Sequence, residues 1–127
     1  MLTIDSMSFN NKVIEMNIRF EYLYRDAGNN KNWGEIVFTN THNLSSESIA
    51  KKPQDNLIDG SYFYACKVDV AELFFDSFDS DLDHDWHEFH AITCCSDEAN
   101  DKQGRDVSGF IQELQGHNLL APTPVIQ

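Results

Sequence analysis

The strongest pattern in the chain is an alternation of apolar and polar residues from Lys12 to Arg25. A period of two residues is typical of a half-buried antiparallel β-strand, because successive side chains point to opposite faces. The apolar face would hold Ile14, Met16, Ile18, Phe20, Tyr22 and Tyr24. The polar face would hold Glu15, Asn17, Arg19, Glu21 and Arg25.

A long turn and a returning strand are predicted next. Residues 26–34 are dense in Asn, Asp and Gly, which tolerate positive φ and therefore favour a hairpin connection. Glu35–Thr39 is apolar enough to form the returning strand. These two strands would make an antiparallel pair.

A helix is expected after this hairpin, with Asn43 or Ser45 as its N-cap. Pro53 falls inside the pattern and removes a backbone hydrogen bond, so we expect a short, kinked or restarted helix. The predicted buried side of this helix consists of Ile49, Leu57 and Ile58.

The second half of the chain predicts two further strands and a second helix. Residues 59–60 form a turn before a strand at Tyr62–Cys66, and Trp86–Thr93 reads as the fourth strand. Residues 68–75 lack a decisive period. A helix is expected over Val107–Gln115, with Asp106 as its N-cap and Gly116 as its stop.

The predicted order β-β-α-β-β-α indicates a two-layer α+β fold. About four antiparallel strands would carry two helices on one face, which leaves an open face or edge for a partner. We expect one domain over residues 12–116, a loosely ordered leader over residues 1–11 and a mobile tail over residues 117–127.

Length and charge limit the classes of function. The chain has 127 residues, which suits one domain. Its formal net charge of -12 argues against direct binding to nucleic acid, whose phosphates require Lys and Arg. No apolar run is long enough to span a membrane, and no signal peptide is recognisable. The odd number of cysteines, Cys66, Cys94 and Cys95, favours a reducing cytoplasm over a disulfide framework.

The negative charge is concentrated between Asp69 and Glu88, where there are eight acidic residues and no Lys or Arg. Carboxylates so close together repel one another, so a cation, a basic partner or solvent must compensate them. The candidate partner-binding residues are Asp76, Asp79, Asp81, Asp83 and Asp85.

This acidic segment also resembles a metal site in part. Asp79, Asp81, Asp83 and Glu88 fall at spacings found in calcium loops. Leu82, however, stands where such loops need glycine. His84, His87 and His90 could bind a transition metal only if a bulge made them converge, because strand parity separates them. We therefore expect no metal and no cofactor.

A second candidate site is the polar hairpin loop. Its Arg25, Asp26, Asn29, Lys31 and Trp33 could hold an anion through backbone N–H groups, or simply tie the end of the hairpin. The preferred hypothesis is that Arg25 or Lys31 reaches Asp83 or Asp85. That contact would join the two segments into one structural or pocket network, whose other members are His84, Trp86, His87 and Glu88.

Two segments resemble a family of small, uncharacterised bacterial proteins. They are YLYRDAGNNKNWG (residues 22–34), followed by IVFTN (residues 36–40), and the later motifs NLIDG (residues 56–60) and LDHDWHEF (residues 82–89). The resemblance covers residues 20–89 and implies a compact cytoplasmic bacterial protein. Pro53 departs from the uninterrupted helix expected in that family. No catalytic residues follow from the resemblance.

The function expected from these features is a small acidic module that binds a basic protein, in an immunity, antitoxin or anti-defence role. One alternative is a metal-dependent hydrolase or nuclease that uses His84, Asp85, His87 and Glu88. Another is a mimic of nucleic acid, with carboxylates in place of phosphates. Nucleophilic catalysis has little support. Cys94 and His90 form the one thiol–imidazole pair close in sequence, and their parity would put them on one face of a strand at a wide distance. An enzyme is therefore less expected than a binding protein, and the sequence leaves the oligomeric state open.

Overall fold

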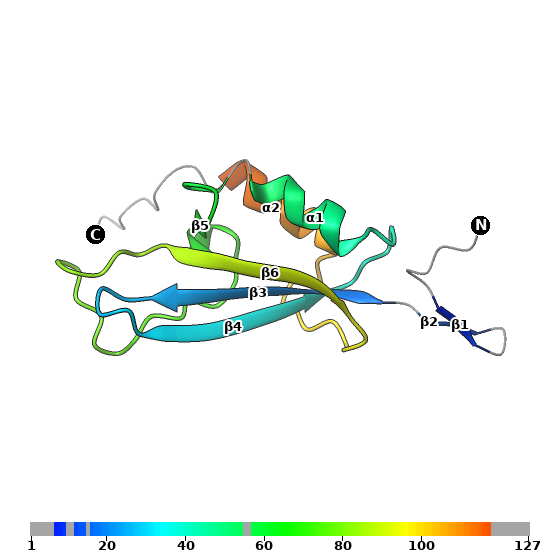
Figure 1. The fold of residues 1–127 in the computed structure, drawn as a ribbon, viewed down its shortest axis with the longest axis horizontal. Coiled ribbons are helices and arrows are strands. Elements are labelled where there is room, and N and C mark those ends of the chain that lie inside the picture. Colours follow the sequence, from blue (N-terminus) through cyan, green and yellow to red (C-terminus); the bar gives the residue numbers. More distant parts are fainter. Residues whose placement is uncertain (1–6, 10–11, 15, 55–56, 118–127) are drawn as a thin grey trace.

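Four antiparallel strands form the main sheet in the spatial order β4-β3-β6-β5, and two helices lie side by side on one face of it (Figure 1). This computed structural model describes residues 7–9, 12–14, 16–54 and 57–117. The fold is α+β, and the main sheet and its helices follow the predicted order β-β-α-β-β-α. The elements are β1 (Met7–Phe9), β2 (Lys12–Ile14), β3 (Asn17–Arg25), β4 (Lys31–Phe38), α1 (Ser46–Gln54), β5 (Tyr62–Phe63), the 3₁₀ helix η1 (Ala65–Lys67), β6 (His87–Cys95) and α2 (Val107–His117).

The alternation in β3 places its apolar residues in the core. Ile18, Phe20, Tyr22 and Tyr24 are at most 1% exposed. The ring of Phe110 from α2 lies 4.9 Å from that of Phe20, at an edge-to-face angle that suits two aromatic quadrupoles. The predicted face of this strand is therefore confirmed from Ile18 to Tyr24.

The predicted strand beginning at Lys12 is divided in the structure. Lys12–Ile14 is a separate short strand, β2, which pairs with β1 in a two-stranded sheet of its own. The predicted leader thus contains a strand, Met7–Phe9, in its described part. The predicted tail, apart from His117 at the end of α2, lies outside the described residues.

Both helices begin where capping chemistry predicts. Ser45 Oγ accepts a hydrogen bond from the backbone N–H of Ser48 at 3.2 Å, as an N-cap does. Asp106 Oδ2 accepts one from the N–H of Ser108 at 3.1 Å. The prediction for Gly116 is wrong, because α2 continues through it to His117.

The middle of the chain departs further from the prediction. Helix α1 ends at Gln54, one residue after Pro53, so Leu57 and Ile58 lie beyond it. Leu57 is nevertheless buried, at 5% exposure. The third strand is only Tyr62–Phe63, because the chain turns into η1 directly afterwards.

A β-bulge in β6 changes the parity of the strand. Glu21 of β3 pairs with Ala91 and the next residue, Tyr22, pairs with Phe89. His90 is therefore the extra residue, and a bulge of this kind re-aims side chains on its strand. As a result, His87 and Phe89 share the core face with Ile92, while Glu88 and His90 lie on the open face.

The segment between η1 and β6 covers the part of the core face that the helices leave open. Tyr22 donates its hydroxyl to the carbonyl of Ala71 at 2.7 Å, and Asn32 donates to that of Leu73 at 3.1 Å. Leu73 lies directly over Gly34 of β4. A Cβ added at Gly34 would stand 2.9 Å from Leu73 Cδ1 and 3.2 Å from the Tyr22 ring. Glycine therefore lets the segment approach the sheet closely.

Replacing Gly34 by valine should lower the free energy of unfolding by about 1–3 kcal/mol, the usual cost of overpacking. Valine itself favours strands, so the loss would come from the collision with Leu73. Urea denaturation of Gly34→Val, alone and together with Leu73→Ala, measures it. We expect a smaller cost in the Leu73→Ala background, and an equal cost in both backgrounds would contradict this explanation.

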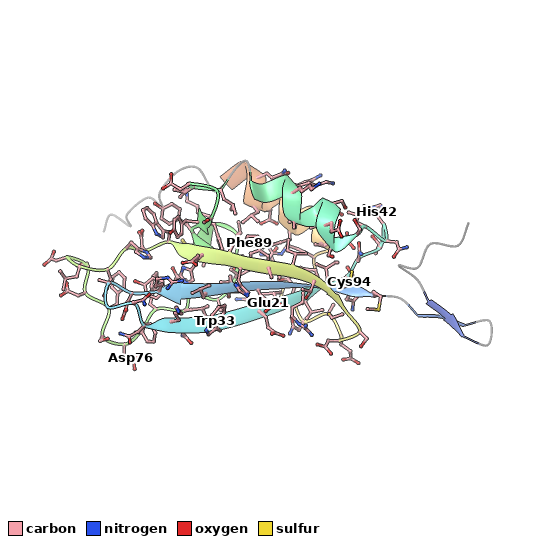
Figure 2. All side chains as sticks on the ribbon, in the orientation of Figure 1. Glu21, Trp33, His42, Asp76, Phe89 and Cys94 are labelled. Carbon is pink, nitrogen blue, oxygen red and sulfur yellow. The ribbon has the colours of Figure 1, made fainter. Side chains whose placement is uncertain are left out.

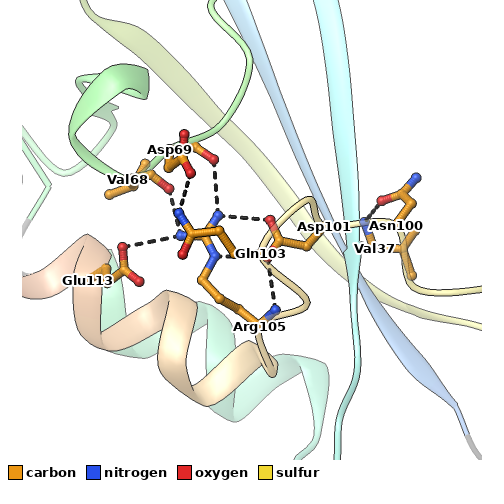
Figure 3. A network of polar contacts seen from close by, with 8 residues as sticks. All are labelled: Val37, Val68, Asp69, Asn100, Asp101, Gln103, Arg105 and Glu113. Carbon is orange, nitrogen blue, oxygen red and sulfur yellow. Dashed lines mark hydrogen bonds and ion pairs between the residues drawn. The ribbon is translucent and has the colours of Figure 1, made fainter.

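A buried guanidinium links the loop after β6 to η1 and α2 (Figure 3). Arg105 is 8% exposed and pairs with Asp101, which is 2% exposed, through two hydrogen bonds of 2.9 Å. Its remaining N–H groups donate to the carbonyls of Val68 and Asp69 and to Glu113. All five donors of the side chain are therefore satisfied. The guanidinium also lies over the rings of Phe38 and Phe110.

Candidate acidic binding site

Residues 79–83 of the acidic segment form a hydrogen-bonded turn. The N–H groups of Leu82 and Asp83 donate to the carbonyl of Asp79 at 3.0 and 2.7 Å. Two carboxylates close the same turn from within, because Asp83 Oδ2 accepts from the N–H of Asp79 and Asp79 Oδ1 from that of Asp81. Residues 79–83 thus use two of their own aspartates to fix the backbone.

The turn is anchored to the tip of the β3–β4 hairpin. Asp83 Oδ1 accepts a hydrogen bond of 2.8 Å from the N–H of Ala27, and Tyr24 donates its hydroxyl to the carbonyl of His84 at 2.7 Å. The N–H groups of Asp79 and Ala27 hold the pKa of the Asp83 carboxyl below its usual value. Burial, together with the nearby carboxylates, raises the pKa of Tyr24 to about 12. The two segments singled out in the sequence are therefore in contact.

Their contact is not the predicted ion pair. Arg25 pairs with Glu88 through two hydrogen bonds of 3.2 Å and donates a third to Asn29 at 2.6 Å. In the described part of the chain no ion pair joins Arg25 or Lys31 to an aspartate of residues 76–85. The reason is register: Leu23 pairs with Glu88, which places that carboxylate beside Arg25 on the open face.

Asp26 closes the hairpin locally. Its Oδ1 accepts from the N–H of Asn30 at 2.8 Å and its Oδ2 from the side chain of the same residue. Asn29 adopts the positive φ that such a tip requires, at 65°. This arrangement is the tied hairpin end, the simpler of the two interpretations of the loop.

Four aspartates of the acidic segment remain exposed to solvent, although Asp79 also accepts a hydrogen bond within the turn. Asp76, Asp79, Asp81 and Asp85 are exposed, and none forms an ion pair with a described residue. Figure 2 shows Asp76 at the end of the sheet where the β3–β4 hairpin turns. The structure thus presents uncompensated negative charge on a fixed backbone.

A cleft of about 490 Å³ opens beside this turn. It is lined by Cys66, Glu72, Phe74, Phe78, Ser80, Asp83, His84 and Asp85. Three carboxylates and two aromatic rings therefore face one hollow, and the rings of Phe74 and Phe78 are 4.9 Å apart. Burial, reinforced by the negative charge of Glu72, raises the pKa of the Cys66 thiol, which makes it a weak nucleophile.

The three histidines His84, His87 and His90 lie in different environments. His87 is 1% exposed, and its Nε2 accepts a hydrogen bond of 2.8 Å from the N–H of Leu73. That bond requires an unprotonated Nε2, and burial lowers the pKa of His87 to about 4. His84 stacks on Trp86, with ring centroids 5.1 Å apart, while His90 meets Trp33 on the open face.

These positions oppose the metal-dependent alternatives. Within residues 7–9, 12–14, 16–54 and 57–117, no three His, Cys, Asp or Glu side chains come together in a way that could hold a metal ion. The four residues named for the hydrolase alternative do not converge, since His87 enters the core while Glu88 turns to Arg25 on the opposite face. Cys94 and His90 are likewise separated, because the bulge puts them on opposite faces and not on the one face that simple parity predicts.

Sequence reasoning missed the wall of the cleft. Glu72, Phe74 and Phe78 lie in a stretch without regular period, which the structure shows to be irregular chain folded over Tyr24. The available signal was the position of these phenylalanines directly before the acidic run. Cys66, which also lines the cleft, lies in η1, whereas the sequence predicted it to end a strand.

No family model, curated protein or solved structure matches the chain. The resemblance of residues 20–89 to small bacterial proteins therefore stays a prediction. Among the described residues, no helix has the length and apolar character needed to cross a membrane.

Proposed function

We propose that this chain is an acidic module that binds a basic protein through residues 76–85 and the adjoining cleft. The observation that carries the proposal is the fixed presentation of Asp76, Asp79, Asp81 and Asp85, exposed and without a described cationic partner. A backbone already held in place loses little conformational freedom on binding, so more of the interaction energy becomes affinity.

Charge supports the same partner class. The net charge of -12 attracts basic proteins over several ångströms and raises their association rate, an effect that salt weakens. The segment from Asp69 to Glu88 contributes eight of the acidic residues. A basic partner would relieve the repulsion among them.

The cleft suits the side chain of an arginine or lysine from the partner. Glu72, Asp83 and Asp85 can accept its hydrogen bonds. Phe74 and Phe78 offer apolar faces to its methylene groups, and an aromatic face attracts a cation. An immunity, antitoxin or anti-defence role fits this arrangement, with a basic toxin or effector as the partner. A cytoplasmic setting, in keeping with the free cysteines, belongs to the same proposal.

Capture from a bacterial lysate tests the proposal. We expect the wild-type protein to retain one or more basic proteins at about 50 mM salt and to release them at about 500 mM, where screening is strong. The triple variant D76N/D81N/D85N should retain at least about fivefold less, because each exposed rim charge contributes modestly to binding.

The matched control removes the same amount of charge elsewhere, in E47Q/D59N/E98Q, three exposed acidic residues outside the segment. It should bind like the wild type. Equal losses in the two triple variants would show that net charge alone acts, and the absence of any retained protein at low salt would refute the proposal.

A further inference from the structure

One edge of the main sheet is only half closed. Strand β4 lies at this edge, with β3 as its neighbour on the other side. At Val37 the outward N–H donates to Asn100 Oδ1 at 2.8 Å, and the outward carbonyl accepts from the N–H of Asn100 at 2.9 Å. The loop after β6 therefore caps this end of the edge.

The rest of the edge has no such cap. In an antiparallel ladder, residues alternate between bonding their neighbour and pointing their backbone groups away. The hydrogen bond from the Asp26 N–H to the Asn30 carbonyl shows which residues of β4 bond to β3 and which point away from it. The same alternation makes the backbone groups of Val37 point outward, as observed. Lys31, Trp33 and Glu35 therefore direct their N–H and C=O groups outward. In the described part of the chain, the backbone groups of these three residues form no hydrogen bond across this edge.

The side chains at this open stretch carry opposite charges at equal spacing on either side of Trp33. Lys31 and Glu35 flank Trp33 symmetrically, and all three are exposed, Trp33 at 53%. We propose that two copies of the chain pair through β4 as antiparallel strands, with Trp33 opposite Trp33 and Lys31 opposite Glu35 of the other copy. A two-fold axis at Trp33 is the isologous arrangement that a homodimer requires.

This register is favoured over its neighbours on backbone grounds. Outward backbone groups of one copy must face outward backbone groups of the other, so a register shift of one residue is excluded. The nearest allowed registers differ by two residues, which moves the two-fold axis by one residue. Moving the axis to Gly34 would place Lys31 opposite Val37, whose backbone Asn100 already occupies. Moving it to Asn32 would place Trp33 opposite Lys31 and leave Glu35 facing the turn residue Asn29. The axis at Trp33 alone gives two Lys–Glu pairs.

The pairing would extend the four-stranded sheet into one of eight strands and bury the exposed indole. Opposite charges directly across a pair of strands are favourable, and like charges are not. The large net negative charge of each copy opposes association. Added salt would screen both this repulsion and the attraction within the Lys–Glu pairs, and the two effects on the dimer have opposite sign. Exchange of charges at constant salt avoids that conflict.

The test is the oligomeric state of K31E, E35K and the double variant K31E/E35K, measured by sedimentation from about 5 µM to about 500 µM. We expect the wild type to show a concentration-dependent dimer. Each single variant should weaken it at least tenfold, since each creates two pairs of like charge. The double variant, and an equimolar mixture of K31E with E35K, should restore it.

Two further measurements make the result specific. Glu35 also lies 3.3 Å from Arg19 within one copy, so urea unfolding must show that E35K is folded at the concentrations used. Amide exchange at Trp33 and Glu35 should slow as concentration rises, because these N–H groups enter the new ladder. A wild-type monomer throughout the range, single variants that dimerise unchanged, failure of the charge exchange to restore pairing, or a dimer with unprotected Trp33 and Glu35 amides would each overturn the proposal.

Discussion

Replacing Arg105 by methionine should lower the free energy of unfolding by about 3–5 kcal/mol, the usual cost of leaving a buried charge without its partner. Asp101, at 2% exposure, would lose both side-chain hydrogen bonds from the guanidinium. The carbonyls of Val68 and Asp69 would lose their donors as well. Methionine fills much of the apolar space over Phe38 and Phe110, so the decrease in unfolding free energy would reflect mainly the lost polar contacts.

Urea denaturation measures this loss, and Arg19→Met is the matched control. Arg19 also bridges two carboxylates, Glu35 and Asp97, but its side chain is 27% exposed. Exposed pairs of this kind contribute about 0–1 kcal/mol. In D101N/R105M we expect the combined loss of unfolding free energy to be smaller than the sum of the two single losses. The asparagine at position 101 has no charge, so removing the guanidinium leaves no buried charge without a partner. A loss in Arg105→Met no larger than that in Arg19→Met would refute the role given to burial.

The protein should lose about 3 kcal/mol of stability through His87 as pH falls from about 6.5 to about 4. The pKa of His87 is lowered from 6.5 to about 4, first by burial and second by the nearby His84. Each unit of that shift corresponds to about 1.4 kcal/mol. A lowered pKa means that the unfolded chain binds the proton more readily, so stability is complete above pH 6.5 and declines below it.

Protonation would also cost the contact that fixes the acidic segment. A protonated Nε2 cannot accept the hydrogen bond from Leu73, and the charge would lie among the rings of Tyr22, Tyr24 and Phe74. The same residue therefore links pH to the position of the cleft wall.

The variant His87→Gln separates this effect from the titration of carboxylates. Glutamine can still accept a hydrogen bond from Leu73 but does not titrate. Its stability should therefore fall less steeply than that of the wild type between pH 6.5 and 4. Parallel pH profiles for the two proteins would contradict the assignment, as would an NMR titration that placed the pKa of His87 near 6.5.

Much of the fold followed from local patterns. The alternation from Ile18 to Tyr24 identified the core face of β3, because the two-residue period is a property of the extended backbone itself. Asp106 was recognisable as an N-cap for a similar reason, since its carboxylate reaches N–H groups only a few residues away. The order of the main elements could be predicted for the same cause.

The candidate site was predictable only in its composition. The sequence identified both segments that meet there, residues 26–34 and 76–90, but assigned the wrong contact between them. Arg25 faces Glu88 and not Asp83, because partners more than sixty residues apart depend on the register of β3 against β6. The bulge at His90 could not be read from residue types either, and it alone decides which histidine enters the core.

By itself, then, the sequence determined the period of the strands, the caps of the helices and the concentration of negative charge, because each depends on neighbours along the chain. Only the tertiary structure decided where Arg105 finds its five acceptors, how Leu73 comes to lie over Gly34, and which carboxylates remain open to a partner. Those contacts join segments distant in sequence, and their geometry exists only once the sheet has set the registers of its strands. The charge of the acidic segment is written in the chain, whereas its fixed and exposed presentation is a product of the fold.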